Sequence, residues 1–267
     1  MKKFSLLAAV LIWIGIWVGV VTTAGASDWQ GHKLADTPTN FIVGYGSLIN
    51  SGSRNSTASA PIPAIPVRVS ASFGYIRSWN DHSLSGFTAL GLRKVKPGET
   101  GMTINAVLYP VEGTDMSKFD KREGLYTRVA VPASQIEAIG WQPLPAAGQF
   151  WIYVPMRFDA LGKRGPPGED LPEPDVDHPL LQSYIDLTVE GCLEYDTDFA
   201  RELLDTTVGW SRYWLNDREG LARRPWIRDA KARDVDLLLA TTPAPAAFFA
   251  SRAFPEMYGE HFRPGAK

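Results

Sequence analysis

Side chains that commonly carry catalysis are sparse in this sequence. The four histidines, His32, His82, His178 and His261, lie far apart along the chain, and no two occur at metal-ligand spacing. The single cysteine, Cys192, falls at helical spacing with apolar residues, which favours a packed thiol over a nucleophile. We therefore expect neither a metal nor another cofactor, and an enzyme of this composition would use a carboxylate as its acid or base.

The first segment that could bind a substrate is the string Gly44-Tyr45-Gly46-Ser47-Leu48. It is not a dinucleotide-binding fingerprint, because the third glycine would fall at Ile49, whose side chain would obstruct helix-to-strand packing. Ser47 also lacks the flanking glycines of a hydrolase nucleophile elbow. A glycine-flanked strand end of this kind can present backbone amides to a carboxylate or an oxyanion.

The second candidate segment is Phe119-Asp120-Lys121-Arg122-Glu123-Gly124-Leu125-Tyr126-Thr127-Arg128-Val129. The pattern from Asp115 to Arg122 suits a short helix, and a β-prone run follows. Glu123 is thus expected at a helix-to-strand junction. Taken by itself, it could be a helix-end carboxylate paired with Arg122 or Arg128, the commoner fate of a glutamate among arginines.

Together the two segments resemble the γ-glutamylcyclotransferase family, with its ChaC-like and AIG2-like members. Residues 41–48 are similar to the family's Tyr-Gly-Ser signature. Residues 119–129 are similar to its Asp-x-x-Glu segment, whose glutamate is the catalytic base and maps to Glu123. The order of the segments and the gap of about 75 residues between them also suit the family. The resemblance covers roughly residues 40–155, and the remainder looks like a longer bacterial branch.

The resemblance implies an α+β fold built on a mixed, partly closed β-barrel with flanking helices and a helical C-terminal extension. It also implies a cofactor-free reaction on a small γ-glutamyl substrate, in which the α-amine attacks the γ-carbonyl and 5-oxoproline is released. A carboxylate in a partly closed pocket can take the amine's proton and return one to the leaving nitrogen. Glu123 would have this role, residues 44–48 would bind the substrate, and Arg77 and Tyr126 would hold its carboxylate or line the pocket.

Two other functions are compatible with these residues. The chain could be an exported binding module for γ-glutamyl-like ligands, although a module without turnover would be expected to lack Glu123. It could also be an amidase acting on γ-linked envelope peptides. The glutamyl amine of such a peptide is normally acylated and cannot cyclise, and hydrolysis would need a water-activating group besides Glu123. The leaving group and the oligomeric state stay open.

The elements that must position these residues are strands first and helices later. Strands are expected at 40–46, 67–79, 102–111, 126–131 and 149–154, with loops at 51–66 and 162–177. Helical spacing occupies 178–195, 198–206 and 235–240. Because no repeat or Gly/Ser linker separates the two parts, residues 27–267 are expected to form one α+β domain whose helical part begins near residue 178.

Composition and the N-terminal segment narrow the class of protein. The chain has 267 residues, 45% of them hydrophobic, and a formal net charge of -2, so no nucleic-acid partner is expected. Lys2 and Lys3, an uncharged run over 4–21 and the small residues 24–26 predict a signal peptide over 1–26 and a periplasmic or secreted protein. The run is also at the lower limit for a bilayer span, so a membrane anchor facing the periplasm is the alternative.

We therefore expect the mature chain to begin at Ser27. N-terminal sequencing or the intact mass of the native protein would show this directly. Recovery of the uncleaved chain from membranes alone would instead identify residues 4–21 as an anchor.

Overall fold

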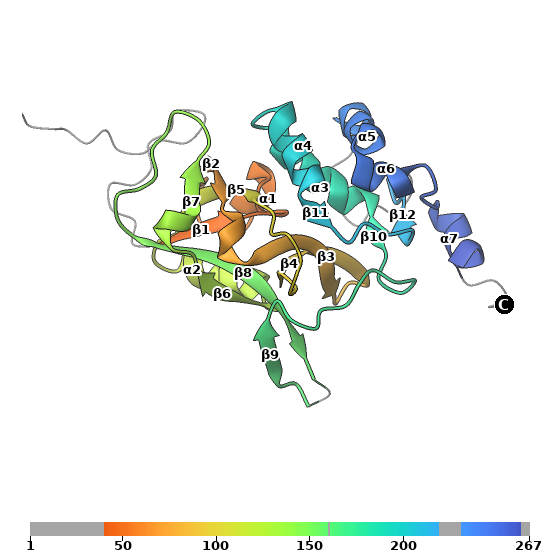
Figure 1. Cartoon of the computed structure of the whole chain (residues 1–267), viewed down its shortest axis with the longest axis horizontal. Coiled ribbons are helices and arrows are strands. Elements are labelled where there is room, and N and C mark those ends of the chain that lie inside the picture. The colour runs from red at the N-terminus through yellow and green to blue at the C-terminus, as the bar shows by residue number, and fades with distance from the viewer. Residues whose placement is uncertain (1–39, 160, 219–230, 263–267) are drawn as a thin grey trace, which may run out of the picture.

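The computed structural model describes residues 40–159, 161–218 and 231–262 (Figure 1). The predicted signal peptide lies outside this range. Within it, no helix is both long enough and apolar enough to cross a membrane.

A mixed sheet of seven strands carries the candidate site. The strands run in the order β6-β8-β1-β5-β2-β7, and β9 pairs with β8. Their bounds are β1 Asn40–Gly44, β2 Ile65–Val69, β5 Ile104–Pro110, β6 Tyr126–Ala130, β7 Ile136–Ala138, β8 Gln149–Phe158 and β9 Arg164–Pro167. The central strands β1 and β5 are buried on both faces, which is why their sequences are apolar without alternation.

The hairpin of β3 (Tyr75–Ser83) and β4 (Phe87–Lys94) forms a separate sheet with β11 (Thr207–Val208), and β10 (Leu180–Leu181) pairs with β12 (Trp214–Leu215). The prediction of one strand over 67–79 was wrong. The chain turns there through a short 3₁₀ helix, Ala71–Phe73, and leaves it at Gly74 with φ of 84°. That left-handed conformation suits glycine, and alternation of side chains alone does not reveal it. The predicted loop at 162–177 likewise contains β9.

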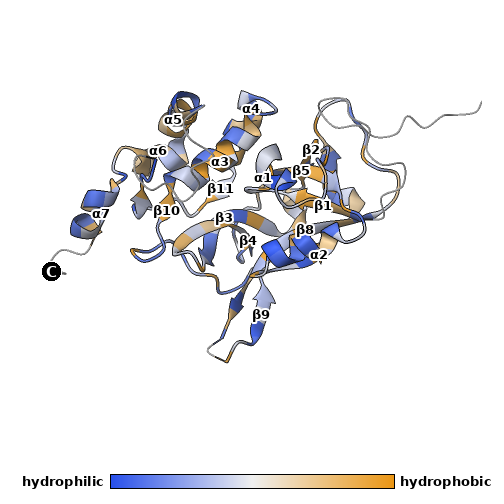
Figure 2. Ribbon diagram, turned by 180° about the vertical axis from the view of Figure 1, so that it is seen from behind, coloured by the Kyte–Doolittle hydropathy of each residue, from blue (hydrophilic) through white to orange (hydrophobic). Residues whose placement is uncertain are grey.

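The helices are α1 Ser51–Asn55, α2 Asp115–Arg122, α3 Gln182–Cys192, α4 Thr197–Asp205, α5 Ala232–Thr241, α6 Pro243–Phe249 and α7 Pro255–Phe262. In Figure 1, α3 to α6 gather beside β3 and β11. Figure 2 shows apolar residues concentrated in α3 and the central strands, and hydrophilic residues along α2. Cys192 is fully buried in α3, so the prediction of a packed thiol is confirmed.

The mixed α+β class is confirmed, but a partly closed barrel is not. Among the described strands, the seven-stranded sheet starts at β6 and finishes at β7 without a pairing between them. The β3–β4 hairpin, which lies between β2 and β5 in sequence, pairs with β11 instead of closing the sheet.

Strand directions bring the two candidate segments to one edge of the sheet. β1 is parallel to β8, and β6 is antiparallel to β8, with Tyr126 opposite Pro155. The end of β1 and the beginning of β6 therefore share an edge. Gly44 closes β1 there, and Glu123 immediately precedes β6.

Helix α3 touches the chain just beyond this edge through Gly191. A Cβ atom at Gly191 would lie 2.5 Å from the backbone nitrogen of Asn50 and 2.6 Å from its Cα. Asn50 caps α1, because its Oδ1 accepts from the Ser53 amide at 2.9 Å. The glycine thus permits a backbone contact that seats the end of the loop against the helix.

We expect Gly191→Ala to lower the free energy of unfolding by about 1–3 kcal/mol, since backbone would have to move to admit the methyl group. Gly259→Ala in α7 is the matched control, because a Cβ atom there meets nothing within 4 Å. Alanine at that position should be neutral or stabilising by roughly 0.5–1 kcal/mol. Equal stabilities of the two variants in denaturant titrations would contradict the proposed close contact.

Candidate active site

A small pocket lies at the shared sheet edge and encloses about 320 Å³ including its open mouth. It is lined by Val43, Gly44, Tyr45, Gly46, Ser47, Leu48, Leu90, Glu123, Tyr126, Tyr153 and Tyr184. The structure thus brings together every sequence-predicted site residue except Arg77. Their functional roles stay predictions, but their meeting in one pocket gives those roles a common location.

The loop after β1 contributes backbone donors. Its turn is closed by the Ile49 amide, which donates to the Gly46 carbonyl at 2.9 Å. Within the described part of the chain, the amides of Gly46, Ser47 and Leu48 donate to no protein acceptor. Successive amides of this kind form a concave donor array suited to a carboxylate or an oxyanion.

The carbonyl groups of the same loop are held by two buried arginines. Nη1 of Arg54 donates to the carbonyls of Leu48 and Ile49, both at 3.0 Å. Nη1 of Arg77 donates to the carbonyl of Tyr45 at 3.3 Å. Because both side chains are buried, the carbonyl side of the loop is fixed against the protein interior.

Of the two glycines in the loop, Gly44 is the one that packing requires. A Cβ atom at Gly44 would lie 2.8 Å from the Cβ of Leu48 and 3.2 Å from the ring of Tyr109. At Gly46 the nearest atom would be 3.5 Å away, an ordinary contact. Gly44 therefore allows the loop to fold back onto the end of its own strand.

Glu123 lies at the C-terminal cap of α2, where the chain turns into β6. Its amide donates to the Phe119 carbonyl at 2.9 Å, and its carbonyl accepts from the Tyr126 amide at 2.8 Å. The side chain is 15% exposed, so it is shielded but reachable from the pocket mouth. Its Oε1 is 3.2 Å from Nε of Arg122, which confirms the ion pair with that arginine. Arg128 pairs with a different carboxylate.

Arg122 joins the two candidate segments. While its Nε contacts Glu123, its Nη2 donates to Oγ of Ser47 at 3.1 Å. Its Nη1 also donates to the Ser53 carbonyl at 2.6 Å and to Oγ1 of Thr57 at 2.8 Å. One planar guanidinium thus sets the position of the carboxylate relative to the loop. The only sequence signal for this role was its place next to Glu123.

Three tyrosines form a rigid wall beside Glu123. The hydroxyl of Tyr45 donates to the Tyr153 carbonyl at 2.7 Å, and that of Tyr126 donates to a backbone carbonyl of β4 at 2.9 Å. The Tyr153 hydroxyl donates to Oδ1 of Asp120 at 2.8 Å. Burial raises the pKa of all three hydroxyls, and the charge of Glu123 adds to the rise. They therefore stay neutral and shape the pocket.

A second buried carboxylate, Asp81, lies behind this wall. It follows a bulge in β3 and is 8% exposed. Burial raises the pKa of Asp81 to about 6, while the nearby Tyr126 hydroxyl lowers it by less. Nothing in the polar sequence around Asp81 indicates that it is buried, because a bulge and its partner strands are not visible in local pattern.

Arg77 does not line the pocket, so its predicted contact with the substrate carboxylate is not supported. The side chain is 0% exposed. Its guanidinium donates over 2.6–3.3 Å to uncharged acceptors, namely the carbonyls of Tyr45, Asn105 and Leu203 and the side chains of Asn105, Thr206 and Thr207. Burial lowers the pKa of Arg77 to about 10, which leaves it charged at neutral pH. Arg77 supports the pocket from the protein interior, through its hydrogen bond to the Tyr45 carbonyl.

We expect Arg77→Lys to reduce the free energy of unfolding by about 3 kcal/mol or more, because an ammonium group cannot reach the acceptors that the guanidinium fork satisfies. Arg233→Lys, on an exposed position of α5, should stay within roughly 0.5 kcal/mol of the parent. Chemical denaturation of both variants measures this. A cost below about 1 kcal/mol would contradict the structural role given to Arg77.

No protein-family model matches this sequence, and no curated protein is recognisably similar to it. Among solved structures, the chain is similar to a γ-glutamyl cyclotransferase at 11% identity and a TM-score of 0.41, over 73% of this chain and 96% of that one. It is similar to an uncharacterized protein from Homo sapiens at 12% identity and a TM-score of 0.39, over 61% and 85% of the two chains. A glutathione-specific γ-glutamyl cyclotransferase from yeast matches at 14% identity and a TM-score of 0.30, over 79% and 96%. These TM-scores all lie below 0.5 and carry no conclusion about activity.

Proposed function

We propose that this chain is a cofactor-free γ-glutamylcyclotransferase that releases 5-oxoproline from a γ-glutamyl amine or peptide. The observation that carries the proposal is the meeting of the Glu123 carboxylate with the amides of residues 46–48 in one pocket. The carboxylate can accept a proton, and the amides can donate hydrogen bonds to a negatively charged oxygen. Cyclisation requires both of these functions.

The reaction begins with the substrate's α-amine, which must be neutral to attack. The neutral nitrogen bonds to the γ-carbonyl carbon, and as it does so Glu123 takes one of the two protons on that nitrogen, which leaves the single N–H of the lactam. The carbonyl oxygen becomes an oxyanion that accepts hydrogen bonds from the amides of residues 46–48. Collapse of this intermediate breaks the bond to the leaving nitrogen, which receives the proton from Glu123. The five-membered lactam and a free amine are the products.

Positioning is the protein's main contribution, because both reacting groups belong to the same substrate molecule. The tyrosine wall and Leu90 restrict the space around a γ-glutamyl group. Arg122 holds the loop and the carboxylate in a single arrangement, so base and oxyanion donors keep a constant separation. Arg122 is in this proposal a positioning residue.

A wider hollow shares Tyr126 with the pocket and could receive the leaving group. It encloses about 820 Å³ including open space, and Arg128, Trp151 and Arg164 are among its lining residues. The guanidinium of Arg128 lies 5.2 Å from the Trp151 ring centre. Arg128 pairs with Asp120 in the same hollow, so it is Arg164 and the aromatic face that favour a leaving group carrying a carboxylate, such as a peptide, over a simple alkylamine.

The first experiment is an assay for 5-oxoproline with purified protein and a panel of γ-glutamyl compounds. In the parent we expect turnover, faster with γ-glutamyl peptides than with γ-glutamyl alkylamines. Glu123→Gln should lower kcat about 10²–10⁴-fold with folding intact, because the amide keeps the shape of the side chain but cannot accept a proton.

Glu137→Gln is the control for loss of one negative charge, since Glu137 is exposed on β7 and outside the pocket. It should keep the parental rate. Asp120 is a less suitable control, because its carboxylate accepts a hydrogen bond from the hydroxyl of the pocket residue Tyr153. If Glu123→Gln retained more than about half of the parental rate, a base contributing even tenfold would be excluded, and the mechanism would have to be abandoned.

A further inference from the structure

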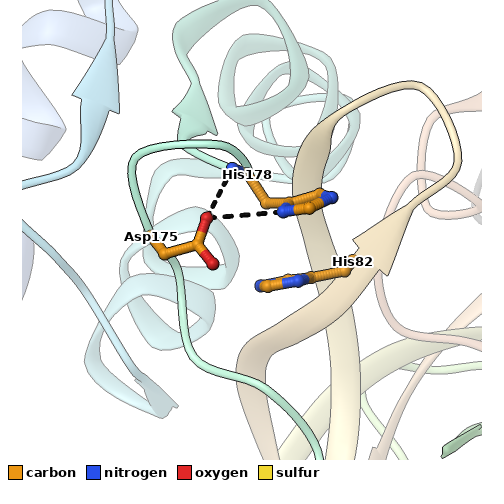
Figure 3. Close-up of side chains that lie close together, drawn as sticks. All are labelled: His82, Asp175 and His178. Carbon is orange, nitrogen blue, oxygen red and sulfur yellow. Dashed lines mark hydrogen bonds and ion pairs between the residues drawn. The ribbon is translucent and has the colours of Figure 1, made fainter. Parts of the chain in front are cut away.

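Three potential metal ligands, His82, Asp175 and His178, meet at the end of the β3–β4 hairpin (Figure 3). One ligand atom from each lies within 4.8 Å of the others. Spacing along the chain predicted no such set, because His82 and His178 are brought together only by folding. We infer that this cluster binds Zn²⁺ or a similar divalent transition-metal ion, independently of the activity proposed above.

Thr88 explains why the two histidines lie side by side. It is the cross-strand partner of His82 in the hairpin. Its amide donates to the Pro179 carbonyl at 2.9 Å, and its hydroxyl donates to the His178 carbonyl at 2.6 Å. The segment that carries His178 is therefore attached to the hairpin, and the imidazole rings stack with their centres 4.0 Å apart.

His82 is held in the tautomer that a metal ligand needs. Its Nε2 is 2.9 Å from the carbonyl oxygen of Glu173. A carbonyl oxygen can only accept, so Nε2 carries a proton, and in the neutral ring the lone pair is on Nδ1. Histidine ligands in proteins typically donate their second N–H to a carbonyl or carboxylate in this manner.

Asp175 is also held in place for coordination. Its Oδ1 accepts from the amides of Asp177 at 2.9 Å and His178 at 2.7 Å, which fixes the carboxylate. The same oxygen lies 3.3 Å from Nδ1 of His178. This is longer than a good charge-assisted hydrogen bond of about 2.7–2.9 Å. Because the two amides use both lone pairs of Oδ1, Oδ2 is the carboxylate oxygen that this geometry leaves for a cation.

A bound cation would lie between the carboxylate and the two rings, where Figure 3 shows Asp175 facing the stacked imidazoles. Lone pairs lie in the ring planes, so one ring must rotate out of the stack to complete the site. That ring is His178, whose 3.3 Å contact with Asp175 is weaker than the hydrogen bond that holds His82. Two nitrogens and one carboxylate suit Zn²⁺ and its transition-metal neighbours, whereas Ca²⁺ and Mg²⁺ prefer oxygen ligands. Three protein ligands leave a further position for water.

Binding would add a cross-link between β3 and the segment before β10. His82 belongs to β3, and Asp175 and His178 belong to the segment before β10. The hydroxyl of Tyr258 in α7 also donates to the Asp175 carbonyl at 3.5 Å. None of the three proposed ligands lines the Glu123 pocket. The expected effect of the metal is therefore on stability.

The test is a titration of the tag-free full chain with ZnCl₂, followed by equilibrium dialysis and isothermal calorimetry. We expect one Zn²⁺ per chain, with no competition from Ca²⁺ or Mg²⁺. His82→Gln and His178→Gln should each weaken binding at least about tenfold, because each removes one of three ligands. His261→Gln, at an exposed position of α7, should bind Zn²⁺ like the parent.

Thermal denaturation provides a second readout. Zn²⁺ should raise the Tm of the parent and of His261→Gln, and this rise should be lost in His82→Gln and His178→Gln. Equal Tm values of all four proteins in EDTA would show that the variants fold. Parental Zn²⁺ affinity in both ligand variants, or no binding by the parent at about 100-fold excess over protein, would overturn the inference. Turnover should be the same with EDTA, so failure of either proposal can be recognised separately.

Discussion

Two buried guanidinium groups decide which side of the pocket loop is available to a ligand. Arg77 donates a hydrogen bond to the carbonyl of residue 45, and Arg54 donates to those of residues 48 and 49. These carbonyl groups of the loop thus have their hydrogen-bond partners in the protein interior. The amides of residues 46–48 are then left for the pocket. A buried charge is costly unless it is hydrogen-bonded, and Arg77 finds its acceptors on the loop after β1, on β5 and near the end of α4. The loop is consequently fixed by the same contacts that join these elements.

The carboxylate is placed by a different constraint, the direction of the strands. Because β6 runs antiparallel to β8 and β8 parallel to β1, the junction before β6 must meet the loop after β1. Arg122 then fixes the position of the carboxylate relative to the loop, because its guanidinium contacts both Glu123 and Ser47. A cyclisation reaction suits such a site, since the nucleophile and the electrophile arrive in one molecule and only their orientation is left to the protein.

The β3–β4 hairpin connects the pocket with the proposed metal site. Asp81 is buried near Tyr126, and the next residue, His82, takes part in the histidine cluster. Consecutive residues of a strand point to opposite faces. One short segment can therefore contribute Asp81 near Tyr126 and His82 to the proposed metal site, while the two side chains stay apart. The bulge before Asp81 sets which residues face which side.

Local pattern by itself determined much about this protein. The bounds of α2 agree with the sequence prediction, and so does the start of β1 at Asn40, although β1 ends at Gly44, before the predicted residue 46. These elements and the junction at Glu123 follow from turn residues, caps and apolar runs that act over a few positions. The grouping of Glu123 with residues 44–48 came from their resemblance to a known family. Only the tertiary structure decided that Arg77 is buried, that Arg122 bridges the two segments and that His82 meets His178. The contacts of Arg77 with Thr207 and of His82 with Glu173 span 130 and 91 residues. Such contacts depend on strand order and on a bulge, and neither leaves a periodic trace in the sequence.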